Sequence, residues 1–126
     1  MSNPAEAIAY VVDDDLAIRE SLSLLLSAND IPSQVFATPQ EFLDNCDLSR
    51  KCCLVLDERL PGMTGLELLD RIPDREHIPV FMITGHGDED MLVTAERKGV
   101  ALCLRKPFDS SELVSCIQRA LYPNRG

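Results

Sequence analysis

Short apolar runs alternate with longer amphipathic stretches five times along the chain. Most of the runs are continuous in apolar residues rather than alternating, which is typical of strands covered on both faces of a sheet. A strand followed by a helix, repeated five times, predicts an α/β fold with a doubly wound, five-stranded parallel sheet and helices on both faces. The predicted strands span 8–12, 34–36, 52–56, 79–83 and 101–104.

The amphipathic stretches carry start and stop signals for helices. Asp14 or Asp15 can cap the first helix, and Thr38 and Thr64 each open a capping box with a glutamate three residues later. Asp88 can cap the fourth helix, and Asp109 or Ser110 the last. The predicted helices span 16–28, 39–45, 65–72, 89–98 and 110–121. The segment 58–63 contains a Pro-Gly pair and is predicted to be a loop.

Four of the predicted strands stop at chemically useful side chains. Because parallel strands place their carboxyl ends at one edge of the sheet, where open α/β sheets bind ligands, these side chains should meet. They are the triplet Asp13, Asp14 and Asp15 after the first strand, Asp57 after the third, Thr84 after the fourth, and Lys106 shortly after the fifth.

Several carboxylates at one edge need a cation. Two carboxylates about 4 Å apart repel by about 4 kcal/mol at an effective dielectric of 20. Lys106 supplies one positive charge, and Mg²⁺, which prefers oxygen ligands and keeps sites open for a phosphoryl oxygen, can supply the rest. A carboxylate nucleophile with these partners and the Thr84 hydroxyl indicates phosphoryl transfer through an aspartyl phosphate.

Composition limits the other possibilities. The chain has 126 residues, which suits one domain, and 45% of them are hydrophobic, which is enough for a core. With 21 acidic and 12 basic residues the formal net charge is −9, which argues against direct binding of nucleic acid or anionic lipid. No leader and no apolar run of ~20 residues is present, so we expect a soluble, cytoplasmic protein without a membrane partner.

The cysteines do not indicate a metal site. Their number, five, is odd, and they show no CxxC spacing. His77 and His86 lie far from them in sequence, so a zinc site is not expected. We expect reduced thiols that pack as small apolar side chains.

With these motifs in hand, the chain resembles a known family: the receiver domains of two-component response regulators. The resemblance runs from Ala9 to Leu121, in motifs at 11–15, 56–65, 83–88 and 106–108. It is greatest to receivers of nitrogen-fixation-type transcriptional regulators. The resemblance implies a flavodoxin-like (βα)5 fold with strand order 2-1-3-4-5, and one receiver domain over residues 1–126.

The resemblance also implies a phosphoacceptor and a metal site. Asp57 would take a phosphoryl group from a sensor histidine kinase. Mg²⁺ would be held by Asp57, by Asp14 directly, by Asp13 through water, and by the backbone carbonyl of Arg59. Such a receiver is not classed as an enzyme; it is a switch that assists its own phosphorylation and dephosphorylation.

The remaining implied roles concern the switch. Thr84 would turn its hydroxyl toward the phosphoryl group, and Lys106, joined to Pro107 by a cis peptide, would pair with it. The fourth helix, fifth strand and fifth helix would then change their surface for homodimerisation or output, most simply transcription regulation. In the family an aromatic residue usually stands where this chain has Cys103, and we interpret Cys103 as a small hydrophobic replacement.

Three alternatives stay open. A haloacid-dehalogenase-like phosphatase also begins with an acidic motif after a strand, although Ala17 and the short chain fit it poorly. A flavodoxin-like flavin carrier shares the fold, but no phosphate-binding loop follows the first strand. Within the receiver family, the chain is either a whole single-domain regulator or part of one whose other domain binds DNA.

Overall fold

The computed structural model describes residues 6–85 and 89–123. Its main sheet has five strands in the order β2-β1-β3-β6-β7, and every neighbouring pair is parallel. Counted along the chain within this sheet, the order is 2-1-3-4-5, so the predicted topology is confirmed. The strands are β1 (Ile8–Val12), β2 (Ser33–Phe36), β3 (Cys52–Asp57), β6 (Val80–Thr84) and β7 (Leu102–Arg105).

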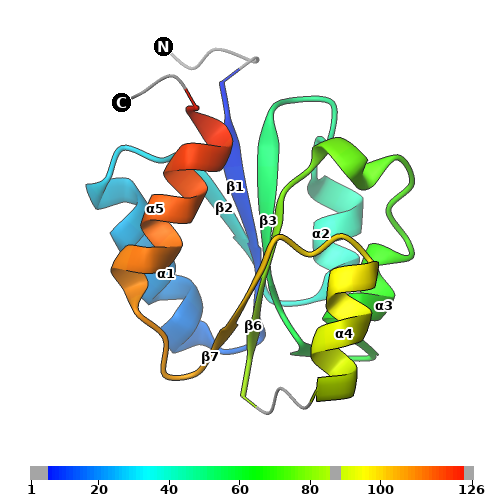
Figure 1. Cartoon of the computed structure of the whole chain (residues 1–126). Coiled ribbons are helices and arrows are strands. Elements are labelled where there is room, and N and C mark those ends of the chain that lie inside the picture. The colour runs from blue at the N-terminus through cyan, green and yellow to red at the C-terminus, as the bar shows by residue number, and fades with distance from the viewer. Residues whose placement is uncertain (1–5, 86–88, 124–126) are drawn as a thin grey trace.

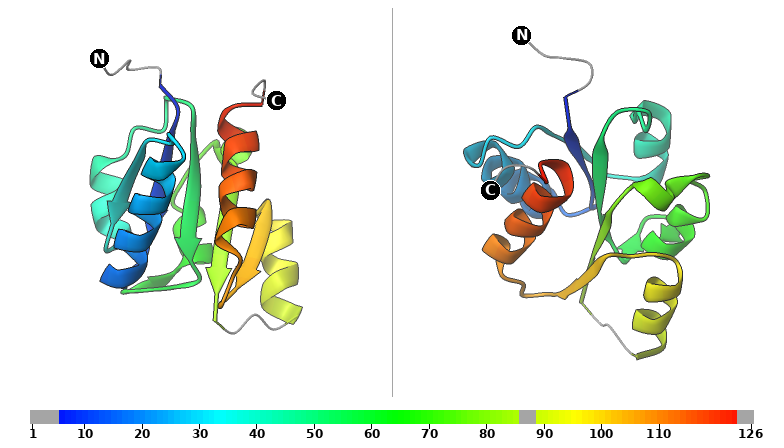
Figure 2. Two further views of the ribbon diagram at one scale, coloured as in Figure 1. Left: turned by 90° about the vertical axis from the view of Figure 1, so that its left-hand side faces the viewer. Right: turned by 45° about the horizontal axis from the view of Figure 1, so that its top comes forward.

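Helices cover both faces of the sheet. In Figure 1, α1 and α5 lie against one face, and α2, α3 and α4 lie against the other, and the two views of Figure 2 show the same layering. A short 3-10 helix, η1, follows α3. The helices are α1 (Leu16–Ala28), α2 (Pro39–Asn45), α3 (Gly65–Leu69), η1 (Arg75–His77), α4 (Glu89–Arg97) and α5 (Ser110–Leu121).

The sheet separates two hydrophobic cores, and alternate residues of a strand enter opposite cores. Along β1, Ala9 and Val11 pack with the α1 and α5 side, whereas Tyr10 and Val12 pack with the α2, α3 and α4 side. All five residues of β1 are buried, as are all six of β3. This two-sided burial is the reason that the strand sequences are continuous in apolar residues.

The capping residues act as their sequence context predicts. Asp15 caps α1 by accepting a hydrogen bond from the Ala17 N–H at 2.9 Å. Thr38 caps α2, with proline in the first turn, and Thr64 opens α3 in a complete capping box with Glu67. Each cap satisfies N–H groups that the first helical turn leaves without a partner inside the helix.

The prediction of a plain loop over 58–63 is wrong. Two short strands, β4 (Arg59–Leu60) and β5 (Met63–Thr64), pair there in an antiparallel hairpin. Gly62 in the turn has a φ of +81°, a conformation that glycine adopts without steric cost. The Pro-Gly pair therefore marks a tight turn between two paired segments.

The third helix ends earlier than predicted. It stops at Leu69 rather than Ile72, because the next N–H groups donate to carbonyls three residues back, which tightens the last turn. Ile72 is nevertheless buried in the core on the α2, α3 and α4 side. Its apolar character correctly predicts contact with the core, but it does not predict helical geometry.

Neither membrane-spanning helices nor disulfides appear in the described parts of the chain. None of the helices within 6–85 and 89–123 has the length and apolar content needed to cross a membrane. All five cysteines are free thiols.

Candidate functional site

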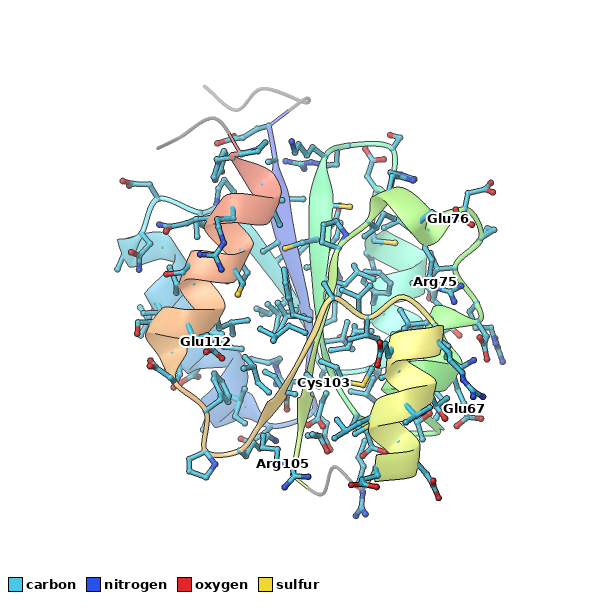
Figure 3. The ribbon with its side chains drawn as sticks, in the orientation of Figure 1. Glu67, Arg75, Glu76, Cys103, Arg105 and Glu112 are labelled. Carbon is cyan, nitrogen blue, oxygen red and sulfur yellow. The ribbon has the colours of Figure 1, made fainter. Side chains whose placement is uncertain are left out.

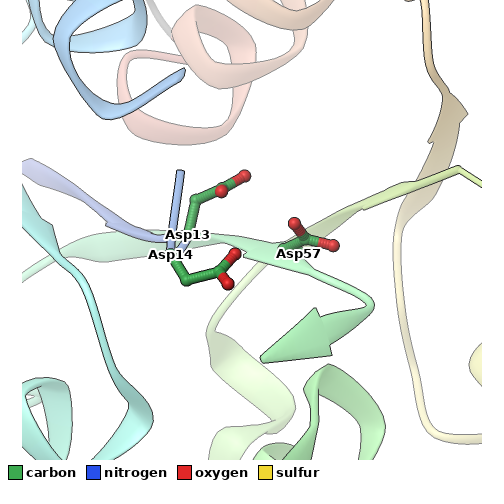
Figure 4. A group of neighbouring side chains, drawn as sticks. All are labelled: Asp13, Asp14 and Asp57. Carbon is green, nitrogen blue, oxygen red and sulfur yellow. The ribbon is translucent and has the colours of Figure 1, made fainter. Parts of the chain in front are cut away.

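Three carboxylates meet at the carboxyl ends of β1 and β3. Asp13 and Asp14 follow β1, and Asp57 is the last residue of β3. One oxygen from each of the three lies within 4.8 Å of the others, and Figure 4 shows the three side chains around a common space. The convergence that the sequence predicted is present.

Asp13 is the most buried of the three. Its side chain is buried, and Oδ1 accepts a hydrogen bond from the Asp15 N–H at 2.9 Å, whereas the buried Oδ2 has no hydrogen-bond partner within residues 6–85 and 89–123. Burial raises the pKa of Asp13 to about 6, and the nearby Asp57 charge adds to this rise, against opposing effects of the Asp15 N–H and Lys106. A buried acceptor without a donor is the arrangement that a cation would complete.

Asp57 is held from two sides. Oδ1 accepts the backbone N–H of Arg59 at 3.0 Å, and Oδ2 lies 3.4 Å from the Lys106 ammonium. The ion pair is long, and about a third of the Lys106 side chain is exposed. The lysine can therefore shift toward a new anionic group without losing a tight contact.

Thr84 and Lys106 reach the same edge through strand pairing. β6 lies beside β3 with Ile83 opposite Asp57, so Thr84 stands one residue beyond the acid. The Lys106 N–H donates to the Thr84 carbonyl at 2.8 Å, and the Lys106–Pro107 peptide is cis, as predicted. Thr84 is fully buried.

Two residues that support the site were not identified from the sequence. A Cβ on Gly65 would lie 2.5 Å from the Asp57 carbonyl oxygen, so only glycine lets α3 approach β3 this closely. Arg19 of α1 donates from Nη1 to the Asp13 carbonyl oxygen at 2.9 Å. The Thr-Gly start of α3 was a usable signal for the first contact, but no local pattern indicates the second.

Comparison with known proteins decides the family. A family model described as the response regulator receiver domain matches residues 9–118. The chain belongs to the response regulator receiver family.

Individual relatives agree with this assignment. The transcriptional regulatory protein FixJ of Azorhizobium caulinodans is 37% identical over 119 residues, which cover 94% of this chain and 56% of that protein. The response regulator protein TodT of Pseudomonas putida is 38% identical over 122 residues, covering 96% of this chain and 53% of TodT. The chain thus spans about half the length of the curated relatives that it matches.

Solved structures match over almost the whole receiver domain. The response regulator StyR superposes with a TM-score of 0.85 at 37% identity, covering 95% of this chain and 61% of StyR. The structure titled FixJ-N gives a TM-score of 0.79 at 34% identity, covering 91% of this chain and 93% of FixJ-N. These matches confirm the resemblance to nitrogen-fixation-type receivers and do not support the phosphatase alternative.

Cys103 occupies a packing position in this receiver domain. It lies in β7 opposite Met82, packs half-buried against the core beneath α2, α3 and α4, and burial raises the pKa of its thiol. Figure 3 shows the side chain directed toward α4. A thiol in this setting behaves as a small apolar side chain. Arg105, two residues later, is exposed.

One sequence prediction, the helix cap at Asp88, concerns a residue outside the part of the chain that the structure describes.

Proposed function

We propose that Asp57 accepts a phosphoryl group from a phosphohistidine of a sensor histidine kinase, in a reaction that needs Mg²⁺. The observation that carries this proposal is the convergence of three carboxylates, with oxygens within 4.8 Å of one another, around a buried Asp13 oxygen for which the described part of the chain offers no donor. Asp57 is the one of the three that also contacts a lysine ammonium.

The donor set suits Mg²⁺. Carboxylate and carbonyl oxygens are its preferred ligands, and it commonly uses one or two carboxylates while it keeps several waters. Asp13, Asp14, Asp57 and the Arg59 backbone carbonyl would hold the ion, with Asp13 acting through water. When bound, Mg²⁺ supplies positive charge that offsets the carboxylates and the phosphoryl oxygens.

The protein's own groups divide the chemical work. One Asp57 oxygen attacks the phosphorus atom, and the bond from phosphorus to the donor imidazole nitrogen breaks with its electron pair left on that nitrogen. The Arg59 N–H orients the Asp57 carboxylate at 3.0 Å. Lys106, 3.4 Å from Asp57, is placed to pair with a phosphoryl oxygen as negative charge spreads over it.

The modification would act as a switch. Phosphorylation adds roughly one to two negative charges beside Lys106 and Thr84. We infer that the Thr84 hydroxyl turns to the new oxygens, and that α4, β7 and α5 then present a different surface for homodimerisation or output. The domain would assist its own phosphorylation and dephosphorylation without turning over a separate substrate.

The output is proposed from the relatives. FixJ is named a transcriptional regulatory protein, and it is about twice as long as the matched region. We propose that this receiver regulates transcription in the cytoplasm through a DNA-binding output domain, on its own chain or on a partner. The net charge of −9 makes direct nucleic-acid binding by the receiver itself unfavourable.

The test uses acetyl phosphate and intact-protein mass. With Mg²⁺, the wild-type chain should gain the mass of one phosphoryl group, and chelation of Mg²⁺ should prevent the gain. The Asp57→Asn variant should stay unmodified, because an amide oxygen is a poor nucleophile. Equal labelling of that variant, or labelling that ignores chelation, would refute the proposal.

A further inference from the structure

The side chain of Arg19 reaches back from α1 to the start of the metal site. Arg19 lies in the second turn of the helix and is half-buried. Its Nη1 donates to the carbonyl oxygen of Asp13 at 2.9 Å. That carbonyl belongs to the peptide group that joins Asp13 to Asp14, the two neighbouring acids of the site.

Other bonds hold the same stretch of main chain. The Arg19 N–H donates to the Asp15 carbonyl at 3.0 Å, and the Asp15 N–H donates to Asp13 Oδ1 at 2.9 Å. Arg19 therefore donates hydrogen bonds to this turn from both its backbone N–H and its guanidinium group. The guanidinium bond is the one that acts on the peptide between the two acids.

Rotation of that peptide group would move both carboxylates. Asp14 is exposed, so its side chain depends on the main chain for its direction. Asp13 Oδ2 has no hydrogen-bond partner among the residues that the structure describes, so the direction of this side chain is set by the bond to Oδ1 and by the backbone. A donor on the Asp13 carbonyl thus controls where two of the three acidic groups point.

We propose that Arg19 is a positioning residue for Mg²⁺: it orients the Asp13 and Asp14 carboxylates through the peptide group between them. This inference rests on the proposed metal site. Groups that orient metal ligands from outside the coordination shell typically contribute 10–100-fold to metal affinity. We therefore expect Arg19→Met to raise the Mg²⁺ dissociation constant by about tenfold or more.

A purely structural role for Arg19 makes a different prediction. It would lower stability when removed and leave Mg²⁺ affinity unchanged. Arg50 provides a matched control, because its Nε and Nη2 donate to the Glu6 carbonyl at 3.0 and 2.7 Å, at the other end of the sheet. Arg50→Met removes the same kind of arginine–carbonyl contact far from the acids.

The experiment measures Mg²⁺ binding by isothermal titration calorimetry in the wild type, Arg19→Met, Arg19→Lys and Arg50→Met. Arg19→Met should bind more weakly by the stated factor, and Arg50→Met should match the wild type. Arg19→Lys should fall between them, because a flexible ammonium holds a carbonyl less firmly than a guanidinium. Phosphorylation of Arg19→Met by acetyl phosphate should need more Mg²⁺ and recover at saturating Mg²⁺.

Each contrary result has a definite meaning. An Arg19→Met dissociation constant within twofold of the wild type, or an equal loss in Arg50→Met, overturns the role of Arg19. If circular dichroism shows that Arg19→Met is unfolded, an unchanged constant in Arg19→Lys overturns it instead. Absence of Mg²⁺ binding by the wild type overturns the metal site itself, which distinguishes the two failures.

Discussion

The two edges of the central sheet differ in how closely their charged and polar groups are paired. At the carboxyl edge, formed by the ends of β1, β3, β6 and β7, three acids meet and the one ion pair to Asp57 spans 3.4 Å. At the amino edge, where these strands begin, polar groups are closely paired. Lys98 contacts Asp70 at 2.7 Å, and the Tyr10 hydroxyl exchanges two hydrogen bonds with the Asp47 backbone.

This difference separates a structural edge from a functional one. Arg75 illustrates the amino edge: although its Nε has no partner in the described parts of the chain, its other nitrogens donate to three backbone carbonyls. At the carboxyl edge, no described residue donates to the buried Asp13 oxygen, and the neighbouring Asp14 and Asp57 add negative charge. Polar groups that pair with one another at the amino edge stabilise the fold. An acid without a compensating positive charge, as at the carboxyl edge, is suited to bind a cation.

The largest expected effect comes from breaking the close packing at the carboxyl edge. Gly65→Ala would place a Cβ 2.5 Å from the Asp57 carbonyl oxygen, and backbone must shift to accept it. We expect a loss of about 3 kcal/mol in the free energy of unfolding, measured by urea denaturation. Gly85→Ala is the control, because its Cβ would meet nothing within 4 Å. Equal losses in both variants would contradict the packing argument.

A second prediction concerns the acid surplus and its pH dependence. The pKa of Asp13 is raised from 3.8 to about 6, so without Mg²⁺ its contribution to stability is fully present below 3.8 and is lost as the pH rises through about 6. Wild-type stability relative to Asp13→Asn should therefore fall by on the order of 2 kcal/mol between pH about 4 and about 7. Denaturation curves with a chelator would measure this difference.

The relative stability of Asp13→Asn at neutral pH should also depend on Mg²⁺. Without Mg²⁺ at neutral pH, the variant should be more stable than the wild type, because it removes a buried charge beside Asp57. With Mg²⁺ this difference in stability should become smaller, because the ion stabilises the wild type, which keeps all three acids. A constant difference between the two proteins across the whole pH window would show that Asp13 does not titrate there.

Addition of Mg²⁺ should offset the negative charge at the carboxyl edge and so reduce its difference from the amino edge. At ten times the dissociation constant, an ion that binds only the folded state adds about 1.4 kcal/mol of stability. Thermal melting should show this gain in the wild type, and Asp14→Ala should lose it. A melting temperature that Mg²⁺ leaves unchanged in the wild type would argue against the site.

The smallest effect is expected at the amino edge. Lys98→Met removes the pair with Asp70, whose side chain is 57% exposed, so that solvent screens the attraction. We expect a slight decrease in melting temperature and no change in Mg²⁺ affinity, measured by the same titration. A clear weakening of Mg²⁺ binding would show that the two edges are coupled.

Much of the fold could be read from local pattern. The order of strands and helices, the caps at Asp15, Thr38 and Thr64, and the meeting of Asp13 and Asp57 all follow from apolar periodicity and from the geometry of parallel sheets. These features depend on residues close together in the chain or on a rule that holds for every sheet of this class. The sequence alone therefore predicts them.

Helix and loop boundaries were less predictable. The β4–β5 hairpin was missed because two-residue strands give too few positions for a period to appear. The early end of α3 was missed because Ile72 is apolar for core packing, whether or not it is helical. In both cases the deciding hydrogen bonds are local, within 59–64 and 67–72, but these segments are too short for their geometry to appear in the sequence pattern.

The sequence by itself determined that acids, a hydroxyl and a lysine would gather at one edge of a five-stranded sheet. Only the tertiary structure decided that Asp13 keeps an oxygen without a donor among the described residues, that Gly65 packs against the Asp57 carbonyl, and that Arg19 holds the peptide beside Asp13. Residue types and spacing set which groups can meet. Their unmet hydrogen bonds and closest contacts depend on atomic packing between segments, which local patterns specify only in part.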